Sequence, residues 1–236
     1  MVQSSEPDLQ SLEDELMALG GLVETMLLDS VDLLSRCDLD GLESLGEAER
    51  QLNKRRLAIE MGSLQFIAYN RPQGVALRRA VAVVEIASEL ERVGEHAKKV
   101  ARANCLTVEH HLRKPVANIH RVGADVQAML SRTLDAYARR DVTAVRLVMA
   151  DAQAIDARYR QVYQQLLEVM NSRPRVVNQA VYISRAAYNL KRAAERVAGI
   201  CDWLHFLVLG SMEGERLELG LPEVQPDLET LVARTQ

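Results

Sequence analysis

Two glutamates spaced four residues apart, Glu91 and Glu95, are the side chains of this sequence best suited to do chemistry together. Residues at that spacing share one face of a helix, while the apolar residues Leu90, Val93 and Ala97 mark the core-facing side. The two carboxylates should therefore point away from the core and repel each other. Carboxylate oxygens suit hard divalent cations and iron, so a bound metal would relieve this repulsion.

The same pattern also fits a solvated helix face without metal. Glu95 can pair with Lys98 or Lys99 on its own helix, and two carboxylates alone do not hold a metal firmly. A second copy of the pattern has Lys191 four residues before Glu195, which is the spacing of a simple salt bridge. We expect any metal to favour the first copy. The candidate metal ligands are Glu91, Glu95 and Glu195.

Other spacings that could carry chemistry are weaker. Asp202 and His205 match one half of a di-iron bundle motif, but the sequence lacks the partner carboxylates and the second motif. Residues 109–111 (Glu-His-His) lie in a polar stretch that we expect to be a solvated connector. A Gly-rich phosphate loop, a nucleophile elbow and an HExxH motif are all absent from the sequence. The sequence therefore predicts no catalytic residues and no organic cofactor.

The composition is that of a helical protein. Gly and Pro total 18 of 236 residues and aromatic residues only 4%, which leaves little material for turns or sheet. Three widely spaced cysteines without a CxxC motif argue against a disulfide framework. The net charge of -4 disfavours nucleic-acid binding, and no apolar run approaches the roughly 20 residues of a membrane span. We expect a soluble, cytoplasmic protein without a secretory signal.

Charge is distributed unevenly along the chain. Residues 8–49 contain twelve acidic residues and one basic residue, whereas residues 50–121 contain fourteen basic and six acidic residues. Neighbouring antiparallel helices with complementary charged faces would explain this pattern. Two separate surfaces for two partners would explain it equally well, and the sequence leaves both interpretations open.

Apolar residues recur every three or four positions along most of the chain, which predicts long amphipathic helices. Six helices of about 30 residues each follow from the expected breaks. The breaks fall at 38–40, at Asn70-Arg71-Pro72, across a polar link at 107–115, at Asp141, at 172–174 and at Gly210.

The two sets of three helices repeat each other. Met26-Leu27 matches Met129-Leu130 at an offset of 103, and residues 89–95 match residues 189–195 at an offset of 100. The predicted fold class is all-α, with two tandem antiparallel three-helix bundles related by a pseudo-twofold internal repeat. The expected domains are residues 8–106 and 109–210. An acidic, frayed C-terminal tail at 211–236 follows, with one short helix near Leu231.

In three segments, LGGLVE at residues 19–24, ELERVGEHA at 89–97 and NLKRAAE at 189–195, the sequence resembles the PhoU family of phosphate-transport accessory proteins. Residues 19–24 (LGGLVE) resemble that family's Met-Gly-Gly-x-Val-Glu opening, and residues 89–97 (ELERVGEHA) resemble its (D/E)LERIGDHA signature. Residues 189–195 (NLKRAAE) resemble a weaker second copy of that signature. The resemblance covers about residues 8–210. It departs from the family pattern at Glu95 and Glu195, where the family usually has Asp, and at Lys191, where it has an acid.

The resemblance implies a cytoplasmic, homodimeric regulator without catalytic activity. Family members couple a phosphate ABC transporter to a membrane sensor kinase and restrain the phosphate-starvation response, so membrane association would occur only through these partners. Some members bind iron or zinc clusters through acidic motifs on the bundle surface. In the second bundle Ala152 and Lys191 replace acidic positions, so a full cluster is not expected there.

Our main hypothesis is a regulatory adaptor that acts by protein–protein binding. One alternative is an accessory protein of a different phosphate permease. The other is a carboxylate-bridged metalloenzyme built inside the bundle.

Overall fold

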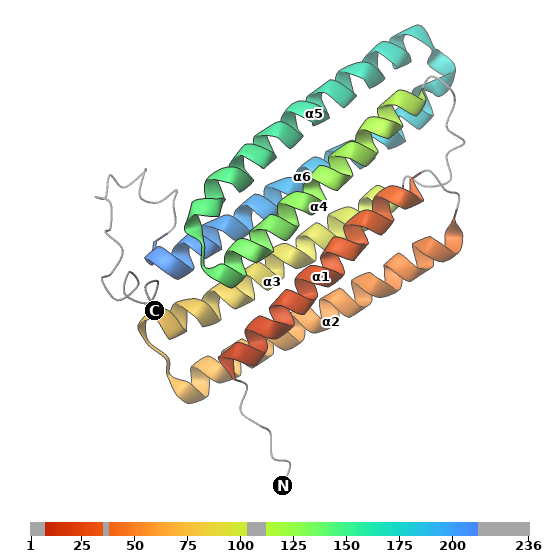
Figure 1. Ribbon diagram of the computed structural model, residues 1–236. Coiled ribbons are helices and arrows are strands. Elements are labelled where there is room, and N and C mark those ends of the chain that lie inside the picture. Colours follow the sequence, from red (N-terminus) through yellow and green to blue (C-terminus); the bar gives the residue numbers. More distant parts are fainter. Residues whose placement is uncertain (1–7, 35–37, 103–111, 212–236) are drawn as a thin grey trace.

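The computed structural model describes residues 8–34, 38–102 and 112–211, and these residues form long α-helices without any strand (Figure 1). The first set comprises α1 (Leu9–Leu33), α2 (Leu39–Asn70) and α3 (Gly74–Ala101). The second set comprises α4 (Arg113–Arg139), α5 (Val145–Ser172) and α6 (Val177–Leu209). The short 3-10 turns η2 (Val142–Ala144) and η3 (Pro174–Val176) precede α5 and α6. None of the helices in these ranges has the length and apolar content to cross a membrane.

The helices end where the local sequence requires it. The Asp38 carboxylate caps α2 by accepting a hydrogen bond from the Gly41 amide at 2.8 Å. Arg71 closes α2 in the left-handed conformation with φ 47°, and Pro72 follows it. Gly210 closes α6 in the same conformation with φ 81°, which glycine adopts without strain.

One expected break was placed wrongly. The polar link was expected to extend to Pro115, but α4 begins at Arg113 and includes this proline. Proline fits the first turn of a helix because the amide that it lacks has no partner there anyway. Residues 103–111, with the Glu-His-His stretch, and the acidic tail beyond Ser211 lie outside the described residues.

The two bundles pack against each other through α3 and α6, which make the most extensive helix–helix contact, and through α1 and α4 (Figure 1). Buried apolar side chains from all six helices form one continuous core. The all-α architecture with two three-helix repeats is therefore confirmed. The repeats share their core across the interface between the bundles.

Burial repeats along the chain with the predicted offsets. Val23 and Leu27 of α1 are fully buried, and so are Val126 and Leu130 of α4, 103 positions later. On α2 and α5 the same offset relates Leu52 to Ile155 and Ile59 to Val162, all of which are buried. On α3 and α6 an offset of 100 relates Leu90 to Leu190, which are buried as well. Equivalent positions of the two bundles can therefore be compared residue by residue.

Two equivalent glycines let α1 and α4 approach closely. A Cβ atom on Gly20 would lie 2.6 Å from Cδ1 of Leu134, and one on Gly123 would lie 2.4 Å from Cγ2 of Val31. Because Gly20 and Gly123, like Val31 and Leu134, are 103 positions apart, this contact has the pseudo-twofold symmetry of the repeat. A side chain at either glycine would require its neighbour to move.

Candidate functional site

The predicted carboxylate pair of the first bundle lies on α3 beside α2. Glu91 forms an ion pair with Nε of Arg56 at 2.8 Å, and Arg56 also contacts Glu60 at 2.5 Å. The Glu91 side chain is only 21% exposed. Burial raises the pKa of Glu91 above its usual value; the Arg56 charge opposes this effect and the Glu95 charge adds to it.

The second member of the pair is more exposed. The Glu95 side chain is 46% exposed and lies 3.5 Å from the ammonium of Lys99. Lys98 instead forms an ion pair with Glu49 of α2. The predicted Glu95–Lys99 pair is therefore present on an exposed part of α3, whereas Glu91 is more buried than the sequence led us to expect.

One further oxygen atom that could ligate a metal lies on α2, in Asn53. The Asn53 side-chain oxygen is buried and accepts no hydrogen bond from the described residues. Its neighbour Leu52 packs directly against Gly94, the residue before Glu95: a Cβ atom on Gly94 would lie 2.2 Å from Cδ2 of Leu52. The first bundle therefore offers two carboxylates and one nearby amide oxygen.

In the second bundle a lysine occupies the equivalent place. Lys191 donates to Glu195 at 2.5 Å, and its ammonium lies 3.8 Å from Asp156. The hydrogen bond to Glu195 raises the pKa of Lys191. Arg192 also pairs with Glu195. The predicted salt bridge between Lys191 and Glu195 is therefore present.

Neither set of side chains fits a preformed metal cluster. Within residues 8–34, 38–102 and 112–211, no group of three or more His, Cys, Asp and Glu side chains is placed to hold a metal ion. Glu91 and Glu95 already face protein cations, and Lys191 places a positive charge between Asp156 and Glu195. Iron or zinc at Glu91, Glu95 or Glu195 stays a prediction.

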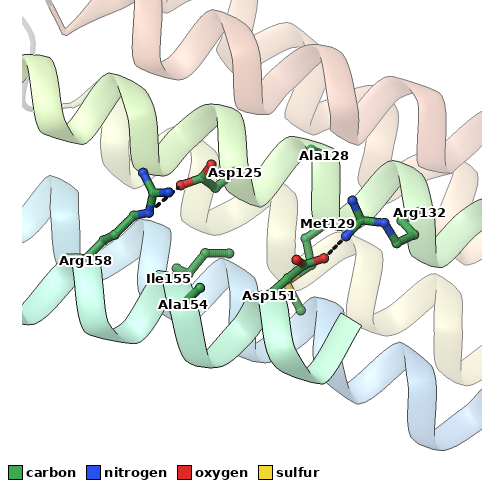
Figure 2. Close-up of a pocket in the computed structure, with 8 residues that line it drawn as sticks. All are labelled: Asp125, Ala128, Met129, Arg132, Asp151, Ala154, Ile155 and Arg158. Atoms are coloured by element: carbon green, nitrogen blue, oxygen red, sulfur yellow. Dashed lines mark hydrogen bonds and ion pairs between the residues drawn. The ribbon is translucent and has the colours of Figure 1, made fainter. Parts of the chain in front are cut away.

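A groove between α4 and α5 lies on the outside of the second bundle (Figure 2). Ala128, Met129, Ala154 and Ile155 line it between two ion pairs. Asp125 pairs with Arg158 at 3.2 Å at one end, and Arg132 pairs with Asp151 at the other. The groove encloses about 160 Å³.

The first bundle has larger side chains at the equivalent positions. Thr25 and Gln51 stand 103 positions before Ala128 and Ala154. The groove therefore exists because α4 and α5 have alanine at these two positions. Its four charges neutralise each other in pairs, so it presents no unpaired charge to an ion.

Two polar residues of the 89–97 segment on α3 make contacts with α6. His96 Nδ1 lies 3.0 Å from Oδ1 of Asn189, and Glu89 lies 3.7 Å from Arg196. Both contacts join α3 to α6. They are equivalent in the repeat, because His96 corresponds to Arg196 and Glu89 to Asn189 at the offset of 100. Burial lowers the pKa of His96 and raises the pKa of Glu89. These polar residues of the signature connect the two bundles.

The buried carboxylate of Glu13 on α1 was not predicted from the sequence. Nε and Nη2 of Arg79 donate to the two oxygens of Glu13 at 3.0 and 2.7 Å, and Arg140 donates to the same carboxylate. The Tyr137 hydroxyl lies 3.3 Å from it. Burial alone would raise the pKa of Glu13, but the hydrogen bonds and charges of Arg79 and Arg140 hold its pKa below the usual value.

This cluster ties together α1, α3 and α4. The Arg140 guanidinium lies over the Tyr137 ring, 4.4 Å from the ring centroid. The backbone of Arg140 is in the left-handed conformation, with φ 56°. Burial raises the pKa of Tyr137 to about 12. The signal for the cluster was present in the sequence, because Glu13 follows Leu12 on the apolar face that continues with Leu16. An acid at a core position requires a charged partner.

Polar side chains on the outer faces and at the interface between the bundles pair with one another in hydrogen bonds and ion pairs. The sequence profile of the PhoU domain matches the chain twice, at residues 16–103 and 119–204. The chain belongs to the PhoU family.

Relatives and solved structures agree with this assignment. The chain is 30% identical to the phosphate-specific transport system accessory protein PhoU homolog of Caulobacter vibrioides over 224 residues, covering 94% of this chain and 96% of that protein. It is 25% identical to PhoU of Escherichia coli over 203 residues, covering 86% and 84%. The crystal structure of PhoU from Pseudomonas aeruginosa superposes with a TM-score of 0.80 at 27% identity, covering 86% of this chain and 98% of that one.

Proposed function

We propose that this protein is a regulatory adaptor of phosphate uptake and phosphate-starvation signalling that acts by protein–protein binding and not by catalysis. The observation that carries the proposal is the double match to the PhoU domain, together with relatives named as accessory proteins of the phosphate-specific transport system. The partners that we propose are a phosphate ABC transporter and a membrane sensor kinase. The protein works in the cytoplasm and reaches the membrane through these partners.

Deleting the gene tests the regulatory part of the proposal. We expect a phosphate-starvation reporter to become active in phosphate-rich medium in the deletion strain, and to be silenced again by the complementing gene. A reporter that stays silent in the deletion strain would contradict negative regulation. It would favour an accessory role for a different phosphate permease.

We further propose that the protein forms a homodimer. Its long amphipathic helices and the family resemblance support this. Sedimentation across the micromolar range should return about twice the monomer mass of 26.4 kDa. A monomer at every concentration would refute the dimer and leave the adaptor role intact.

We also propose that any iron or zinc in the purified protein depends on Glu91 and Glu95 more than on Glu195. The support is Lys191, whose ammonium would repel a cation from the second bundle. Elemental analysis should show a lower metal content in the Glu91→Gln/Glu95→Gln double variant than in the wild type. Unchanged metal in that variant, or complete loss in Glu195→Gln, would be inconsistent with a site in the first bundle.

A further inference from the structure

The outer face of α2 carries an exposed apolar stripe. Leu57, Met61 and Leu64 are 49%, 55% and 51% exposed. Their spacing of four and three residues places them on one face of the helix, away from buried Ile59 and Ser63. Single exposed apolar residues are ordinary on a protein surface, but an aligned set of this kind marks a contact surface.

The second bundle shows that the fold does not require this stripe. On α5 the positions equivalent to Leu57 and Met61 are Arg160 and Gln164, both exposed and polar. The position equivalent to Leu64 is Leu167, which is half-buried. The same place in the repeat is thus a normal solvated face in one bundle and an apolar face in the other.

Positive charge adjoins the stripe. Arg50 and Lys54 continue the same face of α2 toward its N-terminus, and Arg55 lies beside them. Arg50 pairs with Glu47, whereas Lys54 and Arg55 have no ion-pair partner among the described residues. An occupant of this face would therefore combine apolar side chains with acidic ones.

Residues 212–236 of the same chain have this composition. They contain six acidic and two basic residues. Near their end, Leu228, Leu231 and Val232 have the spacing of one helix face, and Asp227 and Glu229 flank the first of them. The segment can offer three apolar side chains to the stripe and carboxylates to the lysine and arginines.

The end of α6 lies close enough to α2 for the segment that follows it to reach the stripe. Nε of Arg78 on α3 donates to the carbonyl of Leu207 at 3.4 Å, which fixes the end of α6 beside the start of α3. The Arg56–Glu91 and Glu49–Lys98 pairs set an antiparallel register that places Arg78 level with the last turn of α2. Met61 is then about 12 Å away along the α2 axis, and the sixteen residue-to-residue steps between Ser211 and Asp227 can span roughly 50 Å.

We propose that residues 212–236 pack along the outer face of α2 in the same chain. Leu228, Leu231 and Val232 cover the stripe of Leu57, Met61 and Leu64, and the acidic residues face Lys54, Arg50 and Arg55. The contact closes an apolar surface of the first bundle that the second bundle does not have.

Methyl NMR of methionine tests this contact on the intact chain. Met61 would be assigned with Met61→Leu, and spectra of the full chain would be compared with a chain that stops after Ser211. We expect removal of the segment to shift the Met61 methyl signal and to leave Met149 of α5, which is 42% exposed, unchanged. An unmoved Met61 signal would overturn the proposal.

Dilution and charge reversal separate this contact from other occupants. A contact within one chain keeps the Met61 shift constant on tenfold dilution, whereas a shift that depends on concentration would show that a second copy is the occupant and overturn the proposal. Arg50→Glu/Lys54→Glu in the full chain should reproduce the spectrum of the truncated chain at Met61. The control Gln153→Glu, at the α5 position equivalent to Arg50, should leave the Met61 signal unchanged. If the double charge reversal also left the Met61 signal unchanged, the proposal would be overturned.

Discussion

α2 and α5 occupy equivalent places in the two bundles and bury equivalent residues, but their outer faces carry different side chains. Leu57 and Met61 on α2 correspond to Arg160 and Gln164 on α5, and Thr25 and Gln51 of the first bundle correspond to the two alanines that open the α4–α5 groove. The repeat has thus kept its core while its surfaces have diverged. The differences between the bundles therefore mark positions that the shared core does not determine.

The same contrast holds for the charged positions beside α3 and α6. Glu91 faces an arginine across the α2–α3 contact, whereas its equivalent Lys191 faces Asp156 and lies 6.0 Å from the centroid of the Tyr159 ring. Arg56 and Tyr159 are themselves equivalent, 103 positions apart. Each bundle pairs the charge at this position with its own side chains. The charge is negative on α3, at Glu91, and positive on α6, at Lys191.

The largest effect is expected at Glu13, whose equivalent in the second bundle is Val116. Glu13→Gln should lower the free energy of unfolding by about 2–3 kcal/mol, because it removes a buried carboxylate from two arginines. Chemical denaturation at pH 7 measures this. The control is Asp14→Asn, at an exposed neighbour, which should change stability by less than about 0.5 kcal/mol.

The Glu13 contribution should also depend on pH. The pKa of Glu13 is lower in the folded protein than in the unfolded chain, where it is about 4.3. Its stabilisation is therefore present above the unfolded pKa and is lost as the pH falls through the folded value. The difference between wild type and Glu13→Gln should shrink below about pH 4. A difference that grows in acid would reverse the sign of this account.

The two glycines at the α1–α4 crossing should respond unequally despite their symmetry. Gly123→Ala meets Val31, whose branched side chain is stiff in a helix, and should cost about 1–2 kcal/mol. Gly20→Ala meets the end of the Leu134 side chain, which can rotate away, so its cost should be largely offset by the better helix propensity of alanine.

Thermal unfolding of both variants checks this asymmetry. Gly21→Ala is the matched control, because a Cβ atom there meets nothing within 4 Å, and it should stabilise the protein by about 1 kcal/mol. If Gly123→Ala were as stable as Gly21→Ala, the close approach of α1 and α4 would be wrong.

The smallest effects are expected at the outer ion pairs. A double-mutant cycle on Arg56 and Glu91, whose side chains are about one-fifth exposed, should give a coupling of about 1 kcal/mol. The cycle on Lys191 and Glu195 should give less, because that pair is more exposed and solvent screens it. A stronger coupling in the second bundle would contradict the difference in burial.

Most helix boundaries could be predicted from the sequence, because the end of a helix depends on the residues next to it. Asp38 and Gly210 could be recognised as helix boundaries from the chain around them. Pro115 was predicted to lie in the link because proline often ends a helix, but proline also fits the first turn of one. Spacing within one helix also predicted the Glu95–Lys99 and Lys191–Glu195 pairs.

Contacts between helices were harder to predict. Glu13 meets Arg79 and Arg140 across 66 and 127 positions of sequence, so no local pattern could pair them. The contacts of Glu89 and His96 with α6 likewise depend on how the two bundles face each other. Such residues can be recognised in the sequence as unusual, but their partners emerge only from the packing of the whole chain.

The central claim is that this protein works by binding a component of a phosphate ABC transporter. Titration calorimetry of the purified full-length chain against the purified ATPase subunit of that transporter tests it most directly. We predict saturable binding, and the Asp14→Asn variant, at an exposed position, should bind as the wild type does. Heat of dilution alone, with the ATPase subunit folded and active, would contradict the claim.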